Sequence, residues 1–222
     1  MTDLATLNDK INQQLPALIQ QSTIANDELT LEIEAQHIHQ ACLVLRDHPD
    51  FNFKMLVDVC GVDYLHYGIG EWETESATLT GFERGVEKSA LQHPHLTTRR
   101  FGVVYHLLSL ELNHRVRLKV FLDTDHLKVA SVMDIWPAAN WYEREAFDLF
   151  GIEFEGHPDL RRLRTDYGFA GHPFRKDFPL IGHVEPRYDA HLGKVIYEPV
   201  SIKPRILEPK VIRKDNRYRV GD

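Results

Sequence analysis

The N-terminal part of the chain alternates between two spacings of hydrophobic side chains. Residues 4–20 (LATLNDKINQQLPALIQ) place Leu and Ile at helical spacing, with Pro16 as the position where the helix kinks or splits. The stretch 28–35 (ELTLEIEA) instead alternates apolar and polar residues, which is typical of a half-buried strand. Residues 35–45 predict a short helix, and the β-branched, apolar run 53–64 predicts an interior strand.

The middle of the chain predicts a hairpin followed by a helix. Residues 100–110 and 114–123 are strand-like and are joined by the turn sequence ELNH. In the second arm, apolar residues occupy every other position: Val116, Leu118, Val120 and Leu122. Residues 128–136 predict a further strand, and a helix is expected from about 138 to 150, ended by Gly151. The pattern predicts an α+β fold, with a mixed or antiparallel sheet and packed helices.

Two stretches depart from this rhythm. Residues 66–98 are rich in Gly, Thr and acidic residues with little periodicity, which predicts a surface insertion. Residues 156–222 carry prolines throughout, which excludes long helices and central strands, yet they remain rich in aromatic and apolar residues. We therefore predict a globular domain over 1–155 and an extended partner-docking segment over 156–222. This segment can bury its apolar residues on its own domain or, more economically, on another protein.

Charge supports the same division. The 222 residues carry a net charge of −7 and are 43% hydrophobic, enough for a proper core. Residues 1–155 carry 12 Lys and Arg against 24 Asp and Glu, whereas 156–222 carry 14 against 9. The basic segment is modest and interspersed with acids, so nucleic acid is a poor partner.

The cysteine count and the N-terminus restrict the compartment and the cofactors. Cys42 and Cys60 have no CxxC partner, so this chain alone cannot build a zinc ribbon or a cysteine-ligated iron–sulfur cluster. They are read as two buried thiols in a reducing compartment, with a disulfide as the alternative. The start lacks a signal peptide, and no apolar run approaches the roughly 18 residues that cross a bilayer. The expected location is cytoplasmic, or membrane-attached only through partners.

The helix 138–150 carries the first candidate for chemistry. Glu143 lies on its apolar arc, and a buried carboxylate needs a charged or hydrogen-bonding partner. It is either a general acid of raised pKa or a structural carboxylate held by Arg161 or Arg162. Arg144, Glu145 and Asp148 lie on the opposite side, facing solvent or a partner, with an Arg144–Asp148 ion pair expected at i,i+4.

Two Gly-His-Pro triplets, at 156–158 and 171–173, carry the second candidate. Each predicts a tight turn in which glycine supplies the unusual backbone angle and the imidazole bonds a carbonyl. The alternative is a metal site built from His157, His172 and Asp159 or Asp166, although the HxxxH and ExxH spacings of helical metal sites are absent.

The charged residues between and after these triplets favour protein docking. Arg161, Arg162, Arg164, Arg175 and Lys176 alternate with aspartates and are interleaved with aromatic residues. The alternative interpretation is a solvent-exposed loop with no role in docking. The sequence contains no GxGxxG, P-loop or GxSxG motif and no Cys/His nucleophile pairing.

Two long runs carry a family resemblance. Residues 142–163 (YEREAFDLFGIEFEGHPDLRRL) and 166–182 (DYGFAGHPFRKDFPLIG) resemble the 30 kDa subunit family of respiratory complex I, the C subunit of bacterial NADH:quinone oxidoreductase. The runs 53–64 and 103–120 look like the family's core strands, and YEPV at 197–200 looks like its tail. Arg164 occupies a position that is usually apolar in the family.

The resemblance implies a structural component rather than an enzyme on its own. Members of the family belong to the peripheral arm, on the cytoplasmic side of the bacterial inner membrane, and dock on the D and B subunits of the complex. They bind no cofactor themselves, while the complex passes electrons from NADH through FMN and iron–sulfur clusters to quinone and translocates protons. No catalytic, cofactor-binding or metal-binding residue is thus expected in this chain. The resemblance assigns an interface or structural role to Glu143, Arg144, Glu145, Asp148, His157, Arg161, Arg162, Asp166, Tyr167, His172, Arg175, Lys176, Asp177 and Pro179.

Two alternatives stay open at this point. One is a stand-alone metallohydrolase that uses the loop histidines. The other is the equivalent component of a membrane-bound hydrogenase or of a photosynthetic NDH complex.

Overall fold

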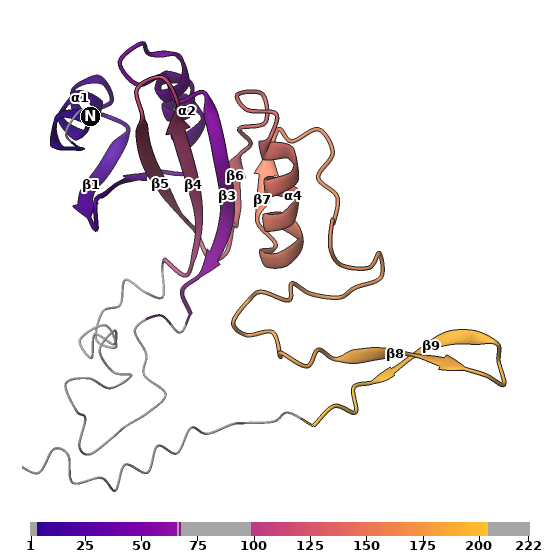
Figure 1. Cartoon of the computed structure of the whole chain (residues 1–222). Coiled ribbons are helices and arrows are strands. Elements are labelled where there is room, and N and C mark those ends of the chain that lie inside the picture. Colours follow the sequence, from indigo (N-terminus) through magenta and orange to yellow (C-terminus); the bar gives the residue numbers. More distant parts are fainter. Residues whose placement is uncertain (1–3, 66, 68–98, 204–222) are drawn as a thin grey trace, which may run out of the picture. The chain divides into compact units, whose positions relative to one another are not determined.

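The computed structural model describes residues 4–65, 67 and 99–203 (Figure 1). The chain divides into two compact units, Met1–Phe178 (unit 1) and Pro179–Asp222 (unit 2), and each is described by itself. The predicted insertion 66–98 lies outside the described residues, apart from Tyr67.

Unit 1 is built on a five-stranded sheet with the strand order β1-β2-β5-β4-β3. The strands β2 and β5 are parallel, and the other neighbours are antiparallel, so the sheet is mixed as predicted. Its strands are β1 (Ile19–Ala25), β2 (Glu28–Ile33), β3 (Met55–Asp63), β4 (Phe101–Ser109) and β5 (His114–Leu122).

One face of the sheet forms the core with two helices, α1 (Leu4–Gln14) and α2 (Ile38–Asp47). The alternate residues of β5 are buried there as predicted. They share one cluster with Leu7 and Ile11 of α1 and with Cys42 and Leu45 of α2. Burial of this apolar surface is the main force holding the unit together.

The helix predicted over 4–20 does break near Pro16, as expected, but the part that follows the break is strand and not helix. The helix α1 ends at Gln14, and Ile19 already begins β1. Pro16 explains the break, because proline lacks the N–H that continues a helix and clashes with the preceding turn. The strand predicted over 128–136 is also shorter, since only β6 (Lys128–Ala130) pairs.

The last layer of unit 1 is a crossover that positions the helix α4 (Ala139–Phe150). The strands β6 and β7 (Glu153–Glu155) run parallel, with α4 connecting them. Gly61 of β3 lets α4 pack closely, because a Cβ atom at this position would lie 2.6 Å from Cδ2 of Phe150. Gly151 ends α4 in the left-handed conformation with φ of 75°, as predicted.

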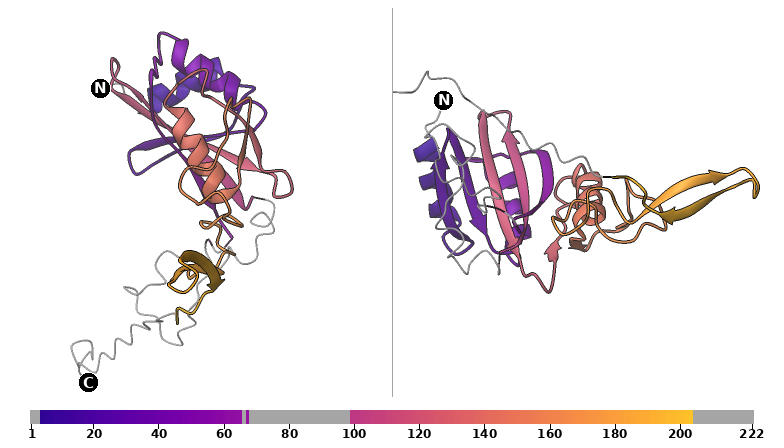
Figure 2. Two further views of the ribbon diagram at one scale, coloured as in Figure 1. Left: turned by 90° about the vertical axis from the view of Figure 1, so that its right-hand side faces the viewer. Right: turned by 90° about the horizontal axis from the view of Figure 1, so that it is seen from below.

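Unit 2 contains a β-hairpin that the proline pattern concealed. The strands β8 (Val184–Asp189) and β9 (Lys194–Pro199) pair with each other in a two-stranded sheet, a ribbon visible in the views of Figure 2. Both strands are edges, where Pro186 and Pro199 are tolerated. The prediction of no long helix or central strand is therefore compatible with a hairpin.

Candidate functional site

Glu143 is completely buried on the inner side of α4. Its carboxyl group accepts hydrogen bonds from Ser131 Oγ at 2.6 Å and from the backbone N–H of Val132 at 2.8 Å. The predicted arginine clamp is therefore wrong, because the donors come from the segment after β6 and not from Arg161 or Arg162. The sequence could not show that this segment returns to the helix.

Burial raises the pKa of Glu143 to about 7, although the hydrogen bonds from Ser131 and Val132 lower it in part. The enclosed position means that no substrate atom reaches the carboxyl group. The raised pKa of Glu143 is thus a consequence of its packing.

Replacing Glu143 with glutamine should flatten the pH dependence of stability. The folded state favours the neutral acid form of Glu143. The contribution of this side chain to the free energy of unfolding is therefore fully present below the unfolded pKa of about 4.5, and it is lost as pH rises toward the folded pKa of about 7. Glu143→Gln has no such titration. Its stability relative to wild type should therefore rise by about 2–3 kcal/mol between pH 5 and pH 8 in urea unfolding. The control Glu145→Gln changes a residue at the outer side of α4, and its stability should depend on pH as that of the wild type does. If the stabilities of all three proteins change with pH in parallel, the raised pKa assigned to Glu143 is wrong.

Asp148, on the same helix, is the most densely hydrogen-bonded carboxylate of the site. Its side chain is fully buried, and Oδ2 accepts three consecutive backbone N–H groups, from Leu163 at 3.0 Å, Arg164 at 2.7 Å and Thr165 at 2.9 Å. Oδ1 accepts from the Thr165 hydroxyl and, at 3.4 Å, from Arg162. The predicted exposed position of Asp148 and its pairing with Arg144 are therefore wrong. An arginine of the following loop does contact a helix carboxylate, but that carboxylate is Asp148.

This hydrogen bonding decides the charge state of Asp148. Burial alone raises the pKa of the carboxyl group, but the bonds from Thr165, Arg164 and Leu163 outweigh that effect and lower it. Asp148 is therefore an anion at neutral pH, and it fixes the chain after β7 onto α4.

The C-terminal end of α4 is capped by residues 172–175. The last four carbonyl groups of a helix have no partner within it. Here Gly151 N–H donates to Phe147 O, and His172 Nδ1 lies 2.9 Å from Asp148 O. The two remaining carbonyls accept from the Phe174 N–H (Leu149 O) and from Arg175 Nε (Phe150 O). Residues 172–175 are thus part of the structure of unit 1.

A second buried carboxylate, Asp63 at the end of β3, holds the next residues. It accepts both Nε and Nη2 of Arg100, at 3.0 and 2.9 Å, and the Lys176 N–H at 2.8 Å. Arg100 also forms an ion pair with Asp177 at 2.9 Å. Asp63 and Arg100 were not singled out by the sequence, because the two residues are separated by the stretch 64–99 and neither belongs to a motif.

The remaining predicted interface residues lie on the surface or partly exposed. Arg161 pairs with Asp159 at 2.8 Å, and Arg164 pairs with Glu145 at 2.6 Å. Asp166 and Tyr167 are exposed and Pro179, which begins unit 2, is half-buried. The structure therefore does not gather the predicted residues into one site. Glu143, Asp148, Arg162, His172 and Arg175 hold unit 1 together, whereas Arg161, Asp166 and Tyr167 are exposed.

The histidines of the two triplets do not form a metal centre with each other. Gly156 and Gly171 have φ of 85° and 95°, as the turn interpretation requires. His172 contacts a helix carbonyl, whereas His157 Nδ1 accepts the Asp159 N–H at 3.1 Å. Within the described ranges, no group of three or more His, Cys, Asp or Glu side chains is arranged to hold a metal ion.

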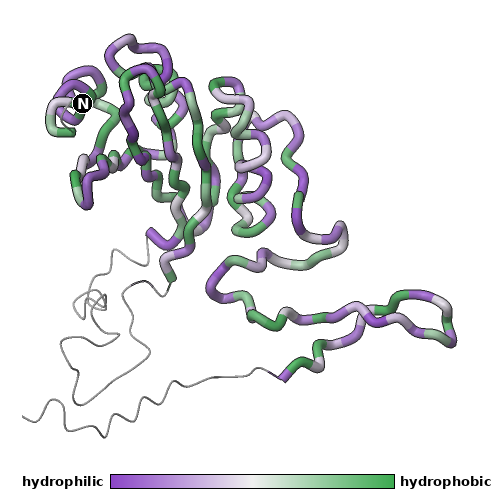
Figure 3. Tube along the Cα trace, viewed as in Figure 1, coloured by the Kyte–Doolittle hydropathy of each residue, from purple (hydrophilic) through white to green (hydrophobic). Residues whose placement is uncertain are grey.

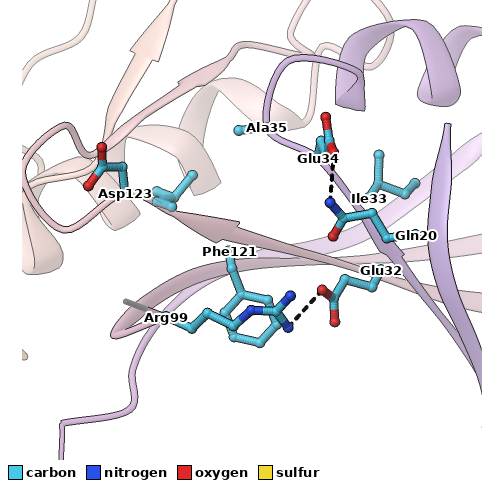
Figure 4. Close-up of a pocket in the computed structure, with 9 residues that line it drawn as sticks. Gln20, Glu32, Ile33, Glu34, Ala35, Arg99, Phe121 and Asp123 are labelled. Carbon is cyan, nitrogen blue, oxygen red and sulfur yellow. Dashed lines mark hydrogen bonds and ion pairs between the residues drawn. The ribbon is translucent and has the colours of Figure 1, made fainter. Parts of the chain in front are cut away.

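A polar pocket lies beside the sheet (Figure 4). It is lined by residues of β1, β2 and β5 with Arg99. Its polar side chains pair with one another: Arg99 with Glu32 at 2.8 Å, and Gln20 with Glu34 at 2.8 Å. The Arg99 guanidinium also lies 5.0 Å from the centre of the Phe121 ring. Arg99 balances the charge of Glu32, whereas Glu34 and Asp123 leave the pocket acidic. No Ser, Thr, Cys, His or Lys side chain is among its lining residues.

The fold defines the structural class of the chain. It is similar to the solved trypsin-resistant fragment (1–134) of Nqo5, with a TM-score of 0.50 and 25% identity over 72% of this chain and all of that one. A chain in the membrane-bound sulfane sulfur reductase, an archaeal respiratory membrane complex, shares the fold with a TM-score of 0.56 at 22% identity, covering 80% of this chain and 86% of that one.

Sequence comparison identifies the family. Residues 31–184 match the model of the respiratory-chain NADH dehydrogenase 30 Kd subunit. The C subunit of NADH-quinone oxidoreductase from Legionella pneumophila (strain Corby) is 57% identical over 98% of this chain and 96% of its own length. The protein of that name from Coxiella burnetii (strain Dugway 5J108-111) is 56% identical over 100% and 98%. The chain belongs to the 30 Kd subunit family of respiratory-chain NADH dehydrogenase, which confirms the resemblance drawn from 142–182.

Proposed function

We propose that this chain is a cofactor-free scaffold in the peripheral arm of a proton-translocating NADH:quinone oxidoreductase. In this role the complex carries out electron transfer from NADH through FMN and iron–sulfur clusters to quinone, and the chain holds its neighbours in place. Its partners are the homologues of the D and B subunits, on the cytoplasmic side of the inner membrane. The relatives named as the C subunit of NADH-quinone oxidoreductase support the assignment to this complex.

The observation that carries the docking role is the two-faced hairpin of unit 2. Residues paired across antiparallel strands point to the same face. The pairs Val184–Pro199, Pro186–Tyr197 and Tyr188–Val195 therefore form one wholly apolar face. The other face carries Glu185, Arg187, Asp189, Lys194, Ile196 and Glu198, including the Arg187–Glu198 ion pair at 2.8 Å. Figure 3 shows the resulting mixture of hydrophobic and hydrophilic positions along both strands.

All six residues of the apolar face are exposed, with Tyr188 at 64% and Tyr197 at 65%. An isolated two-stranded hairpin is marginally stable in water, and each large apolar side chain gains about 1.5–3 kcal/mol on full burial. A partner surface that covers this face supplies the burial that unit 2 lacks. We therefore place the docking surface in 179–203, because residues 162–177 are bonded to unit 1 itself.

The scaffold role is supported by what the buried carboxylates do. Glu143, Asp148 and Asp63 each accept hydrogen bonds from the chain itself.

No helix in the described part of the chain has the length and apolarity to cross a bilayer. Attachment of the chain to a membrane is therefore assigned to its partners.

Affinity purification of the tagged full chain from its own cells, in mild detergent, tests the proposal. We expect stoichiometric recovery of the other peripheral-arm proteins, with FMN and iron in the complex and neither in the chain purified alone. A stand-alone metallohydrolase predicts the reverse: the chain elutes alone, with one zinc or manganese ion bound. That result would remove the proposed function.

A further inference from the structure

The outer face of α4 is covered over only half its length. Trp141, Arg144, Glu145 and Asp148 follow one another at helical spacing and share this face. Residues 163–165 cover Asp148 completely through its three backbone hydrogen bonds. Trp141, one helical turn before Arg144, is left 61% exposed. Tryptophan is highly buried on average, so this exposure calls for a cause outside the described fold.

Arg144 is held against the exposed indole. Its Nε donates to the Arg161 carbonyl at 3.1 Å, and its guanidinium carbon lies 5.4 Å from the centre of the Trp141 ring. The hydrogen bond and the cation–π contact together restrict a side chain that is otherwise flexible. Arg144 is partly buried, and neither of its two Nη atoms has a hydrogen-bond partner within the described part of the chain.

The charges around this pair leave one cation in excess. Arg161 is paired with Asp159, and Arg164 is paired with Glu145. Arg144 makes no ion pair with any residue that the structure describes. A planar guanidinium with free Nη groups is suited to bidentate binding of a carboxylate.

We propose that Trp141 and Arg144 form a second docking site, on unit 1, for an acidic segment of a neighbouring protein of the complex. A carboxylate of that segment binds the Arg144 fork, and an adjacent apolar side chain covers the indole. Interface residues that dominate binding energy are enriched in Trp and Arg, and they lose their water when the partner covers them. The inference rests on the proposed function, because it requires that the chain sits in a multisubunit complex.

Charge reversal and photo-crosslinking in the full chain test this site. Arg144→Glu and Trp141→Ala should each lower the yield of assembled complex at least about tenfold. Neither change should shift the urea midpoint of the free chain by much, because Trp141 is 61% exposed and the Arg144–Arg161 hydrogen bond lies at the surface. The matched control is Lys54→Glu, an exposed cation paired with Glu111 at 3.2 Å on another surface, which should assemble as wild type does. A photo-reactive amino acid at position 141 should crosslink to an identified neighbouring protein, beside an Asp or Glu whose reversal to Arg restores assembly of Arg144→Glu.

The outcomes separate this inference from the proposed function. If the wild-type chain assembles but both variants assemble equally well and position 141 crosslinks to no protein, the second site is wrong and the proposed function stands. Crosslinks to lipid or nucleic acid would also overturn it. If the wild-type chain itself never enters a complex, the proposed function fails first.

Discussion

Asp148→Asn is expected to destabilise unit 1 by about 2–4 kcal/mol. The substitution keeps the size of the side chain but removes the charge that the N–H groups of 163–165 and the Arg162 guanidinium surround. An asparagine amide also places donors where Oδ1 now accepts from Thr165 and Arg162. Urea unfolding at pH 7, followed by circular dichroism and tryptophan fluorescence, measures the loss.

The pH dependence of the unfolding free energy shows whether Asp148→Asn acts by removing the charge or by disturbing the packing. Because the pKa of Asp148 is lowered in the folded state, its contribution is present above the unfolded value of about 3.9 and is lost as pH falls below it. The difference in unfolding free energy between Asp148→Asn and wild type should therefore become smaller toward pH 3. The control Glu145→Gln removes a carboxylate from the same helix whose ion pair with Arg164 is partly exposed, and it should cost less than about 1 kcal/mol. Equal stability of Asp148→Asn and wild type at pH 7 would contradict the role given to Asp148.

Local patterns predicted much of the fold of unit 1. The alternation at 116–122 placed β5 and its buried face correctly, and the Gly151 signal ended α4 at the right residue. These features depend on neighbours in sequence. The strand β1 was missed because Ile19 continued the helical spacing of 4–18, and only Pro16 marked the change.

The partners of buried charges could not be predicted, because they depend on where the chain returns. The helical pattern identified Glu143 as buried, but its donors at Ser131 and Val132 come from a segment predicted to be strand. The same pattern placed Asp148 in solvent, since nothing local showed that 163–165 fold back over it. Trp141 was overlooked for a related reason, because its exposure follows from how far that loop reaches.

The docking proposal depends mainly on the hairpin of unit 2. Tyr188→Asp combined with Tyr197→Asp puts two carboxylates on its apolar face, where a covering partner would have to desolvate them. The matched control, Arg187→Ser with Glu198→Ser, alters two paired residues of the opposite face in the same two strands. Both double variants leave unit 1 untouched, so the urea midpoint of unit 1 should stay at the wild-type value.

Quantifying the complex that copurifies with each tagged full-length variant tests the docking claim most directly. The double tyrosine variant should recover at least about tenfold less of the other proteins of the complex than wild type, and the control should recover them fully. Equal recovery by the tyrosine variant and wild type would show that the apolar face of the hairpin does not hold the chain in the complex.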